Sequence, residues 1–87
     1  MKSKITLYTT RVCPYCVRAK RLLQSKQVEY EEVDTGADSA LWQQMTERSG
    51  GRRTVPQIFI GDLHIGGSDD LSRLELAGEL DRLLGLE

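Results

Sequence analysis

Apolar and polar residues follow each other along this chain in two kinds of pattern, and one of them is typical of β-strands. Residues 5–9 are rich in β-branched and aromatic side chains, and residues 28–33 alternate apolar and polar, as in a half-buried strand. Residues 57–60 form a short apolar run, and residues 63–65 are its expected hairpin partner, joined by Gly61-Asp62 as the turn. The pattern therefore predicts four strands.

The second pattern repeats apolar residues at helical spacing, first over residues 14–26. The apolar side of this helix is expected to consist of Cys16, Ala19, Leu22 and Leu23, with Val17 facing partly inward. A second helix should be capped by Asp38 or Ser39, end at Gly50-Gly51, and carry Leu41, Trp42 and Met45.

A last helix is predicted after Gly66-Gly67, with Ser68 as its cap. Its apolar residues are Leu71, Leu74, Leu76 and Leu80, and Gly78 is expected to bend it or to end its first half. The order strand-helix-strand-helix-strand-strand-helix makes the first two strands parallel, because a crossover helix joins them. We therefore expect an α/β fold, a four-stranded mixed sheet flanked by three helices, as a single domain over residues 1–87.

Composition and charge exclude several classes of function. The chain has 87 residues, of which 39% are hydrophobic and 29% charged, as is ordinary for a globular protein. A net charge of −1 gives no electrostatic basis for binding nucleic acid or a membrane. No apolar run has the length of a membrane span or of a signal-peptide core. With only two cysteines, the chain fits a reducing compartment, and we expect it in the cytoplasm.

The two cysteines form the motif Cys13-Pro14-Tyr15-Cys16, at the junction between the first strand and the first helix. A C-x-x-C pair at such a junction indicates redox chemistry, since the first thiol then lies at a helix N-terminus, where N–H groups and the helix dipole stabilise a thiolate. Pro14 suits the first helical position. Cys16 follows one turn later, where it can attack a mixed disulfide formed on Cys13.

Two structural alternatives for this pair are weaker. A structural zinc site needs four ligands, and the chain offers two cysteines and one histidine, His64. A structural disulfide closing so short a loop would constrain little of the unfolded chain. We expect no metal, and His64 is expected to be structural or exposed.

Two further motifs precede and follow the predicted hairpin. Thr54-Val55-Pro56 ends where the third strand begins, a position that suits proline, and the sequence alone favours an ordinary trans bond there. Gly66-Gly67-Ser68-Asp69-Asp70 is a glycine turn into a helix. It is either a well-capped helix or an anion site in which N–H groups receive a carboxylate while Asp69 receives an ammonium, as an α-amino acid end would require.

These three motifs, in this order, resemble the glutaredoxin family over nearly the whole chain, and residues 51–60, GRRTVPQIFI, are similar to its bacterial members. The resemblance implies a thioredoxin-like fold, a monomer, and glutathione as co-substrate. It implies that Cys13 is the nucleophile, that Cys16 is the resolving thiol, and that Pro56 is a cis proline. It implies a glutathione site formed by Tyr15, Thr54, Val55, Pro56, Gly67, Ser68 and Asp69.

This chain departs from the family pattern at two positions. Many members carry a lysine three residues before the first cysteine, where this chain has Thr10, so Arg11 is the candidate to support the Cys13 thiolate. Many members also have a cysteine where this chain has Ser68. Arg53 is the leading candidate for the glycine carboxylate of glutathione, and the other candidates are Arg48, Arg52, Gln43 and Gln44.

The sequence thus predicts a glutathione-dependent oxidoreductase that reduces protein disulfides and glutathionylated thiols. One alternative is an electron donor that thioredoxin reductase reduces, which would not need an amino acid site. Another is a carrier of an iron–sulfur cluster that bridges two subunits through Cys13 and two glutathiones. Pro14 is expected to stiffen the active-site turn, which counts against this alternative.

Overall fold

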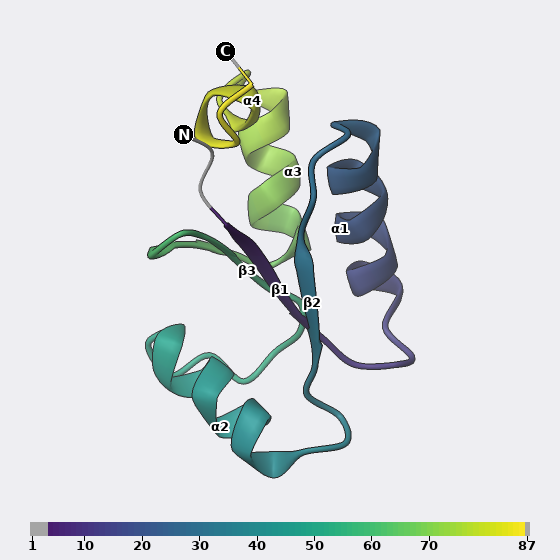
Figure 1. Ribbon diagram of the computed structural model, residues 1–87, viewed down its shortest axis with the longest axis vertical. Coiled ribbons are helices and arrows are strands. Elements are labelled where there is room, and N and C mark those ends of the chain that lie inside the picture. Colours follow the sequence, from purple (N-terminus) through teal and green to yellow (C-terminus); the bar gives the residue numbers. More distant parts are fainter. Residues whose placement is uncertain (1–3, 87) are drawn as a thin grey trace.

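A mixed four-stranded sheet of order β2-β1-β3-β4 forms the centre of the molecule (Figure 1). The structure is a computed structural model and describes residues 4–86. Its strands are β1 (Ile5–Thr9), β2 (Glu31–Asp34), β3 (Gln57–Ile60) and β4 (Leu63–Gly66). As the sequence predicts, β1 and β2 are parallel, whereas β1 pairs with β3, and β3 with β4, in antiparallel fashion.

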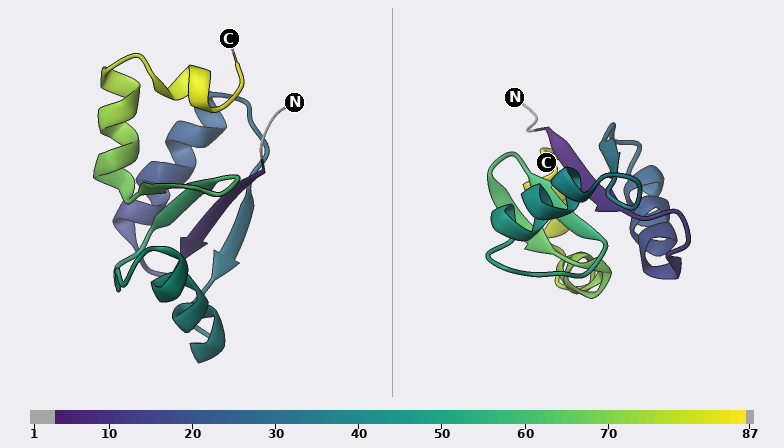
Figure 2. Two further views of the ribbon diagram at one scale, coloured as in Figure 1. Left: turned by 90° about the vertical axis from the view of Figure 1, so that its left-hand side faces the viewer. Right: turned by 90° about the horizontal axis from the view of Figure 1, so that it is seen from below.

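Helices cover both faces of this sheet (Figure 2). They are α1 (Pro14–Ser25), α2 (Ser39–Arg48), α3 (Ser68–Leu76) and the single-turn α4 (Leu80–Leu83). Helices α1 and α3 pack side by side on one face, and α2 lies on the other. No helix within residues 4–86 combines the length and the apolar character that crossing a membrane requires.

Alternating residues of β1 supply the two layers of the core. Ile5 and Leu7 face α1 and α3, where they join a buried cluster completed by Ala19, Leu23, Ile58, Ile60, Leu71, Leu80 and Leu84. Tyr8 points to the opposite face and packs with Phe59 of β3 and Met45 of α2. The period-2 pattern of a strand thus places one set of side chains on each face.

The structure corrects the predicted bounds of two elements. β2 begins at Glu31, three residues later than the alternation predicts, although Val28 and Tyr30 still pack against the core. The last helix, predicted as one element, is divided in two, and the division falls at Gly78, as the sequence analysis expected: α3 ends at Leu76, and Gly78 adopts a positive φ of 74° before α4. The sheet therefore has four helical segments around it rather than three.

Two apolar residues lie outside the core, contrary to prediction. Val17 is 41% exposed and Leu76 is 89% exposed. At about 100° per residue, Val17 lies roughly 120° around α1 from the buried Leu23, and Leu76 roughly 140° around α3 from the buried Leu71. Both side chains therefore leave the helix on its solvent side.

Candidate active site

Cys13 lies at the start of α1, where it is the N-cap residue with extended backbone angles of φ −150° and ψ 100°. Its Sγ accepts a hydrogen bond from the backbone N–H of Cys16 at 3.2 Å. Pro14 occupies the first turn, where its missing N–H removes no helical hydrogen bond. The Cys13 side chain thus takes the place that a serine or aspartate cap usually fills, and a negative charge on its sulfur is stabilised there.

Cys16 has the opposite environment, although it is only three residues away. It is 1% exposed, and burial together with its hydrogen bond to Cys13 raises the pKa of Cys16 to about 12. Both cysteines are free thiols, and Cys13 is half-buried. At neutral pH the Cys16 thiol therefore keeps its proton, and Cys13 is the more accessible of the two thiols, so its role as nucleophile stays a prediction.

A groove of about 570 Å³ runs beside Cys13 between the loop before β3 and the start of α3. All eight residues that the sequence analysis assigns to glutathione line it: Tyr15, Arg53, Thr54, Val55, Pro56, Gly67, Ser68 and Asp69. The sulfur of Cys13 lies 3.8 Å from the carbonyl oxygen of Val55. The fold thus brings the three sequence motifs together around one thiol.

Four further residues line the same groove: Trp42, Arg52, Asp70 and Arg73. The sequence analysis counted Trp42 among the apolar residues of the second helix, and it does pack partly against Tyr8, Met45 and Phe59. Its helical spacing indicated a buried face, and no local signal in the sequence distinguishes a core residue from one that also borders a groove.

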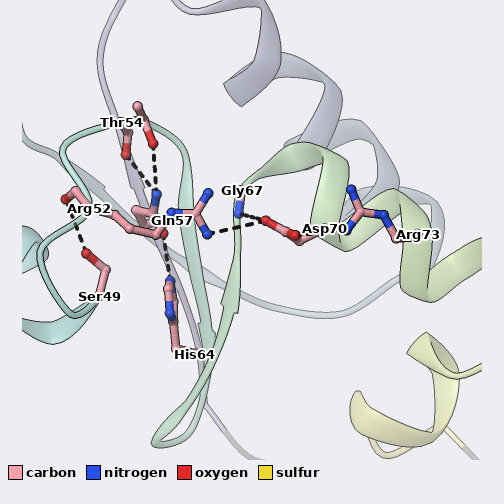
Figure 3. Close-up of polar contacts among 8 residues, drawn as sticks. All are labelled: Ser49, Arg52, Thr54, Gln57, His64, Gly67, Asp70 and Arg73. Carbon is pink, nitrogen blue, oxygen red and sulfur yellow. Dashed lines mark hydrogen bonds and ion pairs between the residues drawn. The ribbon is translucent and has the colours of Figure 1, made fainter.

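The loop that carries Thr54, Val55 and Pro56 is fastened by a buried side chain. The Val55–Pro56 bond is cis, as the family resemblance implies and contrary to the trans bond that the sequence alone favours. Gln57, which is fully buried, donates from Nε2 to the carbonyl oxygen and to Oγ1 of Thr54, both at 3.1 Å. These contacts hold the loop against the first residue of β3 (Figure 3).

His64 on β4 supports that glutamine from the other side. Its Nε2 lies 2.7 Å from Gln57 Oε1, and its ring stacks on Phe59. Burial, and next the charge of Arg52, lower the pKa of His64, so the imidazole is neutral at pH 7. His64 is a half-buried structural residue, one of the two outcomes that the sequence analysis expected.

The start of α3 differs from the prediction in its cap. Gly67, not Ser68, is the N-cap residue, and Ser68 is the first helical residue, buried at 4% exposure. The Gly67 N–H donates to Oδ2 of Asp70 at 2.9 Å. The N–H groups of Ser68 and Asp69 follow in the first turn, where a helix offers them no carbonyl partner. An anion entering the groove meets these donors.

The charged residues near the site divide into paired and unpaired ones. Arg52 and Arg73 both lie 3.4 Å from the Asp70 carboxylate. Arg53 makes no ion pair within residues 4–86, so its charge faces the groove unneutralised. Arg11 lies 3.9 Å from Asp34 and is 89% exposed, so the structure directs it toward β2, and its support of Cys13 stays a prediction.

The other residues considered for the glycine carboxylate have partners of their own. Arg48 stacks on Phe59 at 4.1 Å and donates to Tyr8 Oη, which itself donates to Gln44. Gln43 donates to Glu47 on the same helix. None of these three side chains is among those that line the groove.

A redox pair at a strand-to-helix junction, facing a cis proline on a sheet of this order, defines a thiol–disulfide oxidoreductase of thioredoxin fold. The glutaredoxin family model matches residues 5–65. A glutaredoxin of Pseudomonas aeruginosa is 50% identical over 80 residues, which cover 92% of this chain and 94% of the relative. The chain therefore belongs to the glutaredoxin family.

Solved structures agree with this assignment. The solution structure of a glutaredoxin from Brucella melitensis matches with a TM-score of 0.85 and 50% identity, covering 98% of this chain and 91% of that one. The crystal structure of a buckwheat glutaredoxin–glutathione complex matches with a TM-score of 0.86 and 28% identity, covering 95% of this chain and 77% of that one. The thioredoxin-like fold that the sequence predicts is confirmed.

Proposed function

We propose that this chain is a dithiol glutaredoxin that reduces glutathionylated thiols and protein disulfides with glutathione as the reductant. The observation that carries the proposal is the groove beside Cys13, which is lined by Tyr15, Arg53 and the residues of the 54–56 and 67–69 segments that the family resemblance assigns to glutathione. The buckwheat neighbour, whose fold is the same, was solved as a complex with glutathione. A nucleophilic thiol next to a site for an amino acid end suits this co-substrate.

Reduction of a glutathionylated protein needs Cys13 alone. Its thiolate attacks the glutathione sulfur of the mixed disulfide, and a Cys13–glutathione disulfide forms as the protein thiolate leaves and takes up a proton. A second glutathione, as its thiolate, then attacks the sulfur of the bound glutathione. Glutathione disulfide leaves and the Cys13 thiolate is restored. One free glutathione has been oxidised, the protein sulfur has been reduced to a thiol, and the substrate's own glutathione unit forms the other half of the glutathione disulfide.

Reduction of a protein disulfide uses both cysteines. The Cys13 thiolate attacks one sulfur of the substrate, and the other sulfur leaves as a thiolate. Cys16, deprotonated as that thiolate takes up a proton, attacks Cys13 and releases the second substrate thiol. The resulting Cys13–Cys16 disulfide is reduced by two glutathiones, again giving glutathione disulfide. The side-chain hydrogen bond between the two cysteines, which lie one helical turn apart, suits the resolving step.

The groove offers a place for each end of glutathione. The γ-glutamyl carboxylate is received by the N–H groups of Ser68 and Asp69, and its ammonium by the Asp69 carboxylate. The cysteinyl unit pairs with the Val55 backbone, which brings its sulfur to Cys13. Arg53 receives the glycine carboxylate, since Arg52 and Arg73 are already paired with Asp70.

The test is a coupled assay with a small glutathione mixed disulfide, in which NADPH oxidation is followed with either glutathione and glutathione reductase or thioredoxin reductase. We expect turnover only with the glutathione system. Turnover with thioredoxin reductase alone would support the rival electron donor.

Anaerobic purification, followed by iron and sulfide analysis, tests the cluster carrier. A bound cluster without reductase activity would overturn the proposal.

A further inference from the structure

The two walls of the groove come from separate parts of the chain. One wall is the loop at residues 52–56, before β3, and the other is the turn from β4 into α3 at residues 66–70. Strand pairing between β3 and β4 is irregular at this end, because Ile58 pairs with Gly66 whereas the adjacent Phe59 pairs with His64. One residue of β4, Ile65, is therefore left without a partner in β3, as in a β-bulge next to the turn.

Asp70 connects these two walls through a single carboxylate oxygen. Its Oδ2 accepts the Gly67 N–H at 2.9 Å and lies 3.4 Å from Nη1 of Arg52, 18 residues earlier in the chain (Figure 3). Within residues 4–86 this is the hydrogen bond that links the 52–56 loop to α3. The Gly67 N–H, and next Arg52, lower the pKa of Asp70, so the carboxylate is charged at pH 7.

The backbone around this contact is built to admit the carboxylate. Gly66 has a φ of 118°, which side-chain-bearing residues rarely adopt. A Cβ there would also clash with Oδ2 of Asp70 and approach Arg52 Nη1 to 3.0 Å. Glycine at position 66 thus serves the turn and the bridge together, which indicates that the carboxylate has a defined place in the groove wall.

We propose that Asp70 is a positioning residue, which holds the 52–56 loop and the start of α3 in register through Arg52 and Gly67, so that the two walls receive glutathione together. The proposal rests on the proposed function and adds to it a residue that need not touch the substrate. Its effect is on recognition of the glutathione unit, because Val55 lies on one wall and Ser68 and Asp69 lie on the other.

Arg73 provides a matched control for this role. It lies at the same 3.4 Å from the Asp70 carboxylate as Arg52, but it belongs to α3 itself, three residues along. Arg52→Gln removes one positive charge and the bridge, whereas Arg73→Gln removes one positive charge and leaves the bridge. Asp70→Asn keeps an oxygen that can accept the Gly67 N–H and loses the charge that attracts Arg52.

The experiment measures KM and kcat for a glutathionylated peptide with Arg52→Gln, Arg73→Gln, Asp70→Asn and the double variant Arg52→Gln/Asp70→Asn. We expect KM to rise about three- to tenfold in Arg52→Gln and in Asp70→Asn, with kcat changed by less than about twofold. The double variant should resemble either single one, because both remove the same contact. Arg73→Gln should change KM by less than about twofold.

Two further measurements separate this role from a general loss of structure. The rate of Cys13 alkylation should be unchanged in all variants, and thermal unfolding should confirm that each is folded at the assay temperature. Equal effects of Arg52→Gln and Arg73→Gln on KM, or additive effects in the double variant, would overturn the inference. Failure of the unmodified protein to turn over the peptide would instead overturn the proposed function.

Discussion

The backbone N–H of Cys16 donates to the sulfur of Cys13 at 3.2 Å, so the residue proposed to resolve a mixed disulfide also supports a negative charge on the proposed nucleophile. The two thiols occupy one helical turn, but one is accessible and the other is buried. The backbone N–H bond supports a negative charge on Cys13, whereas burial and a side-chain hydrogen bond with Cys13 oppose one on Cys16 and raise its pKa.

Replacing each cysteine should divide the two reactions. Cys13→Ser is expected to abolish all turnover, because a serine hydroxyl is not ionised at neutral pH. Cys16→Ser should retain activity on glutathionylated peptides, which need only Cys13, and should lose activity on protein disulfides. The measurement is turnover of both substrates by both variants. Activity of Cys13→Ser with inactive Cys16→Ser would show that the assignment is reversed.

The reduced protein should be alkylated at one cysteine only. The pKa of about 12 keeps the Cys16 thiol protonated throughout the pH range in which Cys13 reacts, and burial blocks access to it. Brief treatment with iodoacetamide at roughly pH 8, followed by peptide mass spectrometry, should find the label on Cys13. Denaturation before labelling is the control and should give two labels. Early labelling of Cys16 in the folded protein would contradict its burial.

Asp69→Ala should weaken the use of glutathione without unfolding the protein. Asp69 is exposed at the start of α3, where a charge-assisted hydrogen bond to an ammonium is worth about 1.5–3 kcal/mol before solvent screening. We therefore expect the apparent KM for glutathione to rise about three- to tenfold. An unchanged KM together with a lower melting temperature would assign Asp69 to helix stabilisation alone.

Acid should remove the stability that Asp70 contributes. Its pKa in the folded protein lies below the ordinary value of 3.8, first because of the Gly67 N–H and also because of Arg52. A depressed pKa contributes stability that is present above the unfolded-state value and is lost as the pH falls through the folded-state value. The free energy of unfolding should therefore differ between wild type and Asp70→Asn at pH 7, with the difference shrinking below about pH 4. A difference that is independent of pH would contradict this.

Arg11 should support the Cys13 thiolate in the place of the lysine that position 10 lacks. A nearby cation favours a thiolate, and arginine keeps its charge over the working range. In the Cys16→Ser background, Arg11→Ala should slow alkylation of Cys13 by about two- to threefold at neutral pH, and Thr10→Lys should accelerate it. Arg18→Ala is the control for loss of charge on α1. Identical alkylation rates for Arg11→Ala and Arg18→Ala would contradict this prediction and would show that Arg11 pairs with Asp34 without supporting the Cys13 thiolate.

The sequence by itself determined the features that depend on neighbouring residues. The C-x-x-C pair, its position at a helix N-terminus, the glycine turns and the order of strands and helices along the chain follow from local patterns and short-range sterics. The same local rules misplaced the cap of α3, since Ser68 and Gly67 both suit that position, and it is the Gly67 N–H that donates to the Asp70 carboxylate three residues later. They also extended β2 to Val28, because alternation continues where strand pairing has not yet begun.

The tertiary structure alone decided which distant residues share the groove. Arg52 and Arg53 are adjacent in sequence, but Arg52 pairs with Asp70 whereas Arg53 makes no ion pair among the residues that the structure describes, and no local pattern distinguishes them. Trp42 likewise borders the groove only because α2 packs against the face of the sheet that carries Tyr8 and Phe59. Ion pairs and shared cavities depend on distances across the folded chain, and these arise only when the helices and the sheet have packed.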